Sequence, residues 1–202
     1  MAIVIFVRHG QSETNANRVL SSSLEGYPLT PLGVLQAEHV ALQLQKIEKP
    51  GHFFSSPIQR AIETAKIISR AIGEKPTLDG RIRERGFGSF EGRKFESKPV
   101  MRAFTDEEIR SNYSRGMESW DSLKGRMKNF MESLPDGVSL AISHYDPIRA
   151  AVAVIDKKYD DDLMPNAQAP IPNSSITALD VEGRKIIQMG KETVDGDLLF
   201  SM

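Results

Sequence analysis

The stretch Ala2-Ile-Val-Ile-Phe-Val7, followed at once by Arg8-His9-Gly10, decides the fold. Its apolar residues, most of them β-branched, predict a strand that is buried on both faces, as in a parallel sheet covered by helices. Ligands of such sheets bind beyond the carboxyl ends of the strands. Arg8 and His9 follow this strand directly, so they are the first candidates for a functional site.

The same pattern continues along the chain. Strands are expected at residues 52–55 and 138–143, and a hairpin at 176–181 and 185–189. Helices are expected at 31–47, 57–72, about 120–134 and 147–155, with Thr30, Ser56 and Asp146 as their N-caps. Strands that alternate with helices predict an α/β fold in three layers, a largely parallel sheet with helices on both faces.

Details of the helices and loops extend this prediction. The first helix is expected to pack through the residues that recur at helical spacing, Leu32, Leu35, His39 and Leu42. Gln59 is expected to complete a capping box with Ser56. Residues 80–99 are rich in glycine and arginine and lack periodicity, which predicts an ordered loop. We therefore expect one domain over residues 1–202, with a lid-like insertion at about 80–135.

Composition excludes several classes of protein. The net charge of −1 gives no overall attraction to nucleic acid or to anionic membranes. The longest apolar runs have about a third of the length that spans a bilayer. The chain has no cysteine, which excludes disulfides and thiolate zinc sites and suits a cytoplasmic location. Neither nucleic acid nor membrane is therefore expected as a partner.

Four basic side chains fall at the predicted strand ends. Arg8 and His9 follow the first strand, Arg60 the second and His144 the third. If these strands are neighbours, the four side chains form one cationic pocket. A phosphate dianion is its natural occupant, because the planar guanidinium binds two phosphate oxygens at once and its charge does not titrate.

Two other kinds of ligand are not expected. The histidines show no pairing at helical spacing, and arginines beside a metal ligand would repel the cation, so no metal site is predicted. The chain has neither a Gly-x-x-x-x-Gly-Lys-Ser/Thr loop nor a Gly-x-Gly-x-x-Gly after the first strand. These absences argue against a nucleotide-binding protein.

Glu84 lies inside Arg81-Ile-Arg-Glu-Arg85 and has two interpretations. It is either a carboxylate neutralised by arginines in an exposed loop or a general acid beside the phosphate. A phosphate nearby would raise the pKa of Glu84 by like-charge repulsion, which suits protonation of a leaving oxygen. If Glu84 is not the acid, Glu13, Glu25 and Asp146 are the next candidates.

Six sequence blocks, in this order, resemble the histidine phosphatase superfamily, which includes cofactor-dependent phosphoglycerate mutases and their phosphatase relatives. The blocks are Arg8-His-Gly-Gln-Ser-Glu-Thr-Asn15, Leu29-Thr-x-x-Gly33-x-x-Gln36-Ala37, Ser55-Ser-Pro-x-x-Arg60-Ala-x-x-Thr64-Ala65, Glu84-x-x-Phe-Gly88-x-x-Glu91-Gly92, Ser143-His144 and Asn173-Ser-Ser. The resemblance extends from Ile3 to about Thr177. No single block is decisive, but the set is highly specific.

The resemblance implies a nucleophilic His9 that is phosphorylated and dephosphorylated in each turnover. It implies that Arg8, Arg60 and His144 hold the phosphoryl group, that Asn15 and Ser174 contribute to phosphate binding, and that Glu84 is the acid. An imidazole is a competent nucleophile when its other nitrogen donates to a fixed acceptor. We expect that acceptor to be a backbone carbonyl near Gly10.

Within the family, a phosphatase is favoured over a mutase. Gln11-Ser12-Glu13 and Glu84-Arg85 resemble the mutase motifs, but Gly86-Phe87 replaces His-Tyr and paired substrate-binding arginines have no clear counterpart. We expect a metal-independent phosphomonoester hydrolase that acts on small anionic phosphometabolites without a cofactor. The alternative is a mutase that uses 2,3-bisphosphoglycerate, and the outside alternative is a non-catalytic phosphate-binding module.

Four residues are candidates for substrate specificity. Residues 81–102 carry an excess of positive charge that includes Arg85, Arg93 and Lys94, which would favour substrates with a second anionic group. Tyr145 stands where the family has glycine after the second histidine. It is strained if the backbone there needs a positive φ, or it lines the pocket.

The sequence leaves open whether two copies of the chain assemble as a homodimer.

Overall fold

The computed structural model describes residues 1–95, 104–162 and 169–195 and contains one sheet of six strands in the order β3-β2-β4-β1-β5-β6. The strands are β1 (Ala2–Arg8), β2 (His52–Ser55), β3 (Thr77–Leu78), β4 (Gly137–Ser143), β5 (Ile176–Asp180) and β6 (Lys185–Lys191). The first four in this order are parallel, whereas β5 pairs antiparallel with both β1 and β6. The expected α/β fold is confirmed, with a mixed sheet.

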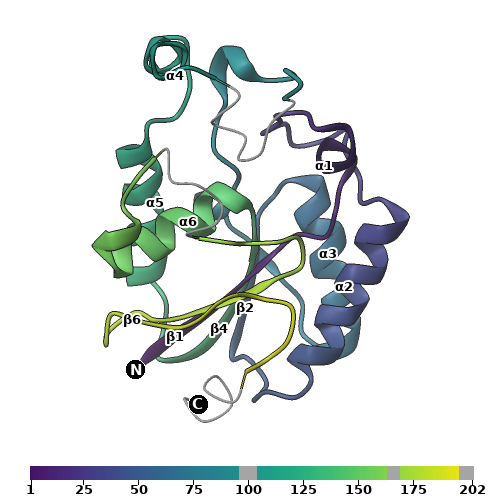
Figure 1. Cartoon of the computed structure of the whole chain (residues 1–202). Coiled ribbons are helices and arrows are strands. Elements are labelled where there is room, and N and C mark those ends of the chain that lie inside the picture. Colours follow the sequence, from purple (N-terminus) through teal and green to yellow (C-terminus); the bar gives the residue numbers. More distant parts are fainter. Residues whose placement is uncertain (96–103, 163–168, 196–202) are drawn as a thin grey trace.

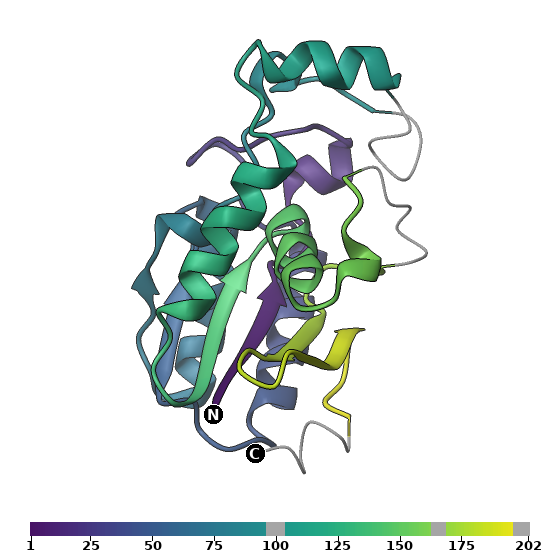
Figure 2. The ribbon, with the colours of Figure 1, turned by 90° about the vertical axis from the view of Figure 1, so that its left-hand side faces the viewer.

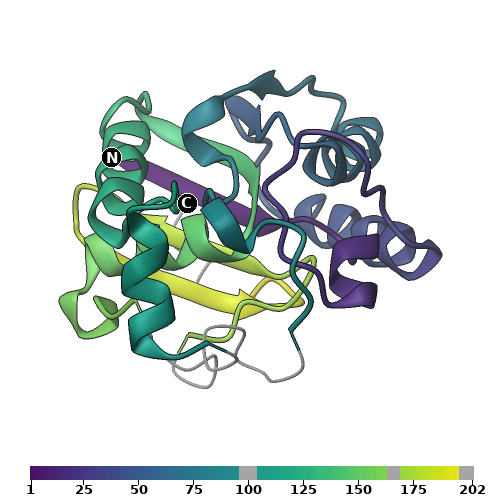
Figure 3. The same ribbon diagram turned by 90° about the horizontal axis from the view of Figure 1, so that it is seen from above.

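Helices cover both faces of the sheet, as Figures 1 and 2 show. They are α2 (Pro31–Leu44) and α3 (Gln59–Ile72) on one face, and α5 (Trp120–Glu132) and α6 (Tyr145–Ile155) on the other. Seen from above, the strands run between these two helical layers (Figure 3). Two apolar clusters, one on each face of β1 and β4, form the core. No helix in the described part of the chain is long and apolar enough to cross a membrane.

The segment expected as a lid-like insertion, residues 80–135, divides into two parts. Helix α5 buries its apolar stripe from Trp120 to Phe130 against the sheet, as its spacing predicts. The part that lies above the sheet includes the short helix η2 (Gly88–Phe90) and α4 (Asp106–Tyr113) (Figure 1). It has its own apolar cluster, which also takes in Leu20. The part of the chain that the structure describes also contains the short helices α1 (Glu13–Asn17), η1 (Gly80–Ile82) and η4 (Lys157–Tyr159).

Two helices begin at other residues than expected. Helix α3 begins at Gln59 with Ile58 as its N-cap. The Ser56 hydroxyl accepts from the backbone N–H of Ile58 at 3.3 Å and contacts His144, whereas the Gln59 side chain bonds to Gly26 and Glu63, so the expected capping box does not form. Helix α6 begins at Tyr145, with His144 rather than Asp146 as its N-cap. Pro147 then lies within the first turn, where its missing N–H leaves no hydrogen bond unmade.

The buried face of α2 is not the one expected. Its buried residues are mostly small, namely Gly33, Ala37, Val40, Ala41, Gln43 and Leu44. Leu32, Leu35 and Leu42 are 49%, 62% and 60% exposed, and His39 is exposed as well. Small side chains let this helix approach the sheet and the neighbouring loop closely, which outweighs the larger apolar area of the leucines. The helix also ends at Leu44, before the expected Ile47.

The loop after β1 packs against the start of α2 backbone to backbone. A Cβ added to Gly10 would lie 2.3 Å from the carbonyl oxygen of Gly33, and one added to Gly33 would lie 1.9 Å from that of Gln11. Neither position has room for a side chain. The close contact fixes the loop that carries His9 to the helix beside it.

Candidate active site

Strand register brings the candidate residues together. Arg8 of β1 lies opposite Ser143 of β4, so His9 and His144 follow at the same edge of the sheet, with ring centroids 5.0 Å apart. A cavity of about 440 Å³ opens there. Its polar lining includes Arg8, His9, Asn15, Arg60, Glu84, Tyr145, Asp146, Arg149 and Asn173. Residues scattered along the sequence therefore meet in one place, as their positions after strands predict.

His9 is a buried and uncharged imidazole. Its Nδ1 donates to the carbonyl oxygen of Gly10 at 2.7 Å, the acceptor expected from the sequence. This tautomer leaves Nε2 unprotonated, and Nε2 accepts a hydrogen bond from Nε of Arg60 at 3.1 Å. Burial, and then the charges of Arg60 and Arg8, hold the pKa of His9 well below its usual range. Nε2, the nitrogen beside Arg60, is therefore unprotonated and can act as a nucleophile.

Two arginines provide fixed positive charge beside His9. Arg8 donates through Nη1 to the carbonyl oxygen of Ile171 at 2.7 Å, and Arg60 through Nη2 to that of Ser21 at 2.9 Å. Buried Nε of Arg8 and Nη1 of Arg60 have no hydrogen-bond partner within the described residues. Burial lowers the pKa of Arg60 to about 10, so it remains charged at neutral pH. These unpartnered donors fit the oxygens of a phosphoryl group.

His144 packs beside His9, is fully buried and is not among the residues that line the cavity. Its Nε2 is 2.7 Å from the hydroxyl of Ser56, and its Nδ1 has no partner among the residues that the structure describes. Burial, followed by the charge of Arg60, holds the pKa of His144 well below its usual range. A neutral ring with Nδ1 protonated would accept from Ser56 through Nε2. Because His144 does not line the cavity, its predicted contact with the phosphoryl group stays a prediction.

Two asparagines border the cavity. The Oδ1 atom of Asn15 accepts from the backbone N–H of Ser12 at 3.0 Å and from Nδ2 of Asn173 at 3.0 Å. Asn173 also donates to the carbonyl oxygen of His9 at 3.1 Å, so it links the two loops. Ser174 has a φ of +56° and lines a neighbouring hollow rather than this cavity. Its predicted contribution to phosphate binding stays a prediction.

Glu84 is a buried carboxyl group in the cavity wall. Its Oε1 accepts from the backbone N–H of Arg85 at 2.9 Å. Burial, and then the neighbouring Asp146 carboxylate, raise the pKa of Glu84 to about 7. A group that exchanges its proton near neutral pH can serve as acid in one step and as base in the next. Of the alternative acids, Asp146 lines the cavity, whereas Glu13 and Glu25 are exposed and do not.

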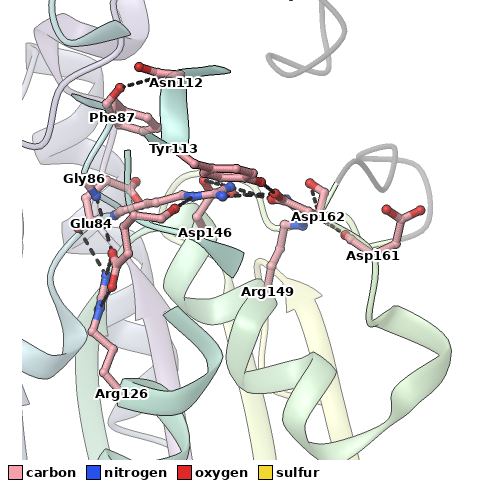
Figure 4. A network of polar contacts seen from close by, with 12 residues as sticks. Glu84, Gly86, Phe87, Asn112, Tyr113, Arg126, Asp146, Arg149, Asp161 and Asp162 are labelled. Atoms are coloured by element: carbon pink, nitrogen blue, oxygen red, sulfur yellow. Dashed lines mark hydrogen bonds and ion pairs between the residues drawn. The ribbon is translucent and has the colours of Figure 1, made fainter. Parts of the chain in front are cut away.

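A polar network holds the loop that carries Glu84 (Figure 4). Arg126 donates to the carbonyl oxygen of Glu84 at 3.3 Å and forms an ion pair with Glu118. The Arg85 guanidinium is fully buried and forms a two-pronged pair with Asp162, at 2.5 and 3.0 Å. Asp162 occupies this fork and Arg85 does not line the cavity, so its predicted role in substrate choice stays a prediction.

The other specificity candidates lie in different surroundings. Tyr145 has no positive φ, so it carries no strain, and its ring lines the cavity with the Arg8 guanidinium 5.2 Å from the ring centroid. Arg93 and Lys94 are exposed and do not line the cavity, and the Arg93 guanidinium lies 4.9 Å from the ring centroid of Phe90. Their predicted effect on substrate choice is untested.

Several residues of the site could not be predicted individually. Ser56, Thr64 and Asn173 lie inside the quoted sequence blocks, and the Thr64 hydroxyl accepts from the backbone N–H of Gly10 at 3.1 Å. Arg149 lies outside these sequence blocks, and no other motif in the sequence points to it. It pairs with Asp146 at 3.2 Å and is 3% exposed. Within the described residues, no three acidic or histidine side chains form a group that could hold a metal ion.

Comparison with known proteins gives a consistent result. The family described as the histidine phosphatase superfamily (branch 1) matches residues 4–189. A 2,3-bisphosphoglycerate-dependent phosphoglycerate mutase of Thermoplasma acidophilum is 34% identical, over 94% of this chain and 92% of the relative. A phosphoserine phosphatase mutant of Entamoeba histolytica, in complex with phosphoserine, has a similar fold. Its TM-score is 0.76 at 20% identity, over 98% of this chain and 100% of that one.

Proposed function

Because the chain belongs to the histidine phosphatase superfamily, we propose that it hydrolyses phosphomonoesters in two steps through a phosphohistidine at His9. In the first step Nε2 of His9 attacks phosphorus, the P–O bond to the alcohol breaks, and the alcohol oxygen takes the proton of Glu84. In the second step the Glu84 carboxylate takes a proton from water, whose oxygen attacks phosphorus. Inorganic phosphate leaves, and His9 is regenerated.

One observation carries this proposal, namely the state of His9. Its Nδ1–H is held by Gly10, its Nε2 is unprotonated, and two fixed guanidinium groups adjoin it. Phosphoryl transfer needs chiefly positioning and stabilisation of negative charge, which this arrangement supplies. A non-catalytic phosphate binder would need neither a nucleophile nor the Glu84 acid beside it, so that alternative is not supported.

A mutase remains the second candidate, because the Thermoplasma acidophilum relative has that name. A mutase must hold a substrate with two anionic ends. Among the described residues that line the cavity, Arg149 is the only lysine or arginine besides Arg8 and Arg60, and it is already paired with Asp146. We therefore expect phosphate release to exceed isomerisation of 3-phosphoglycerate. The test follows both products, with and without 2,3-bisphosphoglycerate, and isomerisation that this cofactor greatly accelerates would favour the mutase.

Turnover without a metal ion is expected, because Arg8 and Arg60 supply the positive charge that a metal would otherwise bring to the phosphoryl group. Activity toward p-nitrophenyl phosphate should be unchanged, within about 10%, after prolonged dialysis against EDTA. A loss that zinc or magnesium restores would contradict this prediction. A cytoplasmic location and the absence of an organic cofactor are part of the same proposal.

A further inference from the structure

A second hollow lies beside the first half of α2. It has a volume of about 300 Å³ and is lined by Leu32, Leu35, Gln36, His39, Asn173, Ser174 and Glu192. Leu32 and Leu35 face it although they are 49% and 62% exposed. Exposed apolar side chains that gather at a hollow and are rimmed by polar residues are typical of a ligand-binding groove.

This hollow adjoins the catalytic cavity. Gln36, Asn173 and Glu192 line both. Two of these shared residues are tied to the nucleophile's loop, because Gln36 accepts from the backbone N–H of Gln11 at 2.8 Å and Asn173 donates to the carbonyl oxygen of His9 at 3.1 Å. A molecule whose phosphoryl group lies at His9 can therefore extend along this boundary to the leucines.

The described lining of the hollow offers no lysine or arginine, and the carboxylate of Glu192 at the boundary repels a second anion. Leu32 and Leu35 form its apolar part, and its other lining residues are polar, so it suits an uncharged group whose apolar end reaches the leucines. We propose that the hollow is a subsite for an apolar alkyl or aryl portion of the substrate's alcohol. This inference rests on the proposed phosphomonoesterase function and narrows its substrate class to esters with an apolar extension.

The same helix provides a matched control. Leu42 lies on the exposed face of α2 and is 60% exposed, like Leu35, but it lines neither hollow. If the leucines instead joined two copies of the chain, Leu42 would contribute as much as Leu35. If they form a subsite, only Leu35 and Leu32 matter. Leu35→Gln and Leu42→Gln remove equally exposed apolar groups and so separate the two interpretations.

Binding of n-alkylphosphonates, from methyl to octyl, tests the subsite without requiring turnover, because their P–C bond is not hydrolysed. The Kd is measured by calorimetry for the native chain and both variants. Full burial of a methylene gives about fourfold tighter binding, and a hollow open to solvent gives about twofold for each methylene that reaches it. Leu35→Gln should abolish this gain, whereas Leu42→Gln should keep it. Methylphosphonate should bind equally to all three proteins, which also shows that the variants are folded.

Two results would overturn the inference. One is a Kd of the native chain that does not change with alkyl length. The other is an equal loss in Leu35→Gln and Leu42→Gln, together with a changed sedimentation coefficient, which would assign the leucines to an interface between copies. Hydrolysis of p-nitrophenyl phosphate is measured separately. Its absence would contradict the proposed function, whereas a flat phosphonate series with normal hydrolysis would contradict the subsite alone.

Discussion

His9→Ala is expected to lose activity toward every phosphomonoester by roughly 10⁴-fold or more, as removal of a covalent nucleophile does in other enzymes. The loss should be the same for good and poor leaving groups, because each substrate must first transfer its phosphoryl group to Nε2. The native protein, mixed with substrate labelled in its phosphate and quenched, should carry label that is acid-labile and alkali-stable. His9→Ala should carry none.

His52→Ala is the matched control for this experiment. His52 is an exposed histidine at the start of β2, at the opposite end of that strand from Ser55 and Ser56. Its replacement should leave both the label and the rate unchanged. Label that persists on His9→Ala would assign the phosphoryl acceptor to another side chain, and buried His144 would be examined first.

Glu84→Gln should separate substrates by their leaving groups. Alkyl phosphates release an alkoxide that must be protonated, so formation of the phosphoenzyme from them should slow by roughly 10²- to 10⁴-fold. p-Nitrophenolate leaves as an anion without being protonated, so Glu84→Gln should slow phosphoenzyme formation from p-nitrophenyl phosphate far less. Water activation should then become limiting, which gives a burst of p-nitrophenol followed by a slow steady state in rapid-mixing measurements.

The pH dependence follows from the pKa of about 7 at Glu84. The acid form is present below this pH, so phosphoenzyme formation from alkyl phosphates should fall as pH rises through about 7. Hydrolysis of the phosphoenzyme needs the carboxylate and should fall as pH decreases through the same range. Both dependences should vanish in Glu84→Gln and persist in Glu13→Gln, a control at an exposed carboxylate.

The leaving-group experiment has an outcome that would contradict the role of Glu84. If Glu84→Gln slows phosphoenzyme formation from alkyl phosphates and from p-nitrophenyl phosphate equally, Glu84 is not the acid, and Asp146 would be the next candidate.

The sequence predicts the site best where buried strands end. Parallel strands place their following residues at one edge of a sheet, so Arg8 and His144 are predicted to meet without any knowledge of the packing. Asn173 and Ser174 are different, because they precede β5, which is antiparallel. The residues before an antiparallel strand lie at the same edge of the sheet as the residues after a parallel one. A search restricted to residues that follow strands would therefore miss Asn173 and Ser174. Only the family resemblance points to these two residues.

The incorrectly predicted face of α2 has another cause. Spacing alone cannot distinguish two faces of a helix when both carry apolar residues, and burial of the larger leucines would remove more apolar area from water. Close packing decides otherwise, since Gly33 and Ala37 allow an approach that leucine would prevent. The start of α3 also differs from the prediction. The Ser56 hydroxyl bonds both to the backbone N–H of Ile58 and to His144, which follows β4 far along the chain and which local sequence does not reveal as a partner.

The contact between Gly10 and Gly33 has a consequence for the length of the ester that can bind. Because two backbones touch there, the loop with the nucleophile and the helix with Leu35 cannot slide past each other, and the spacing between the two hollows is constant. An ester that occupies both must span that interval. The protein would then select among homologous esters by the number of bonds between phosphorus and the apolar group, because the position of the helix fixes the distance that these bonds must span.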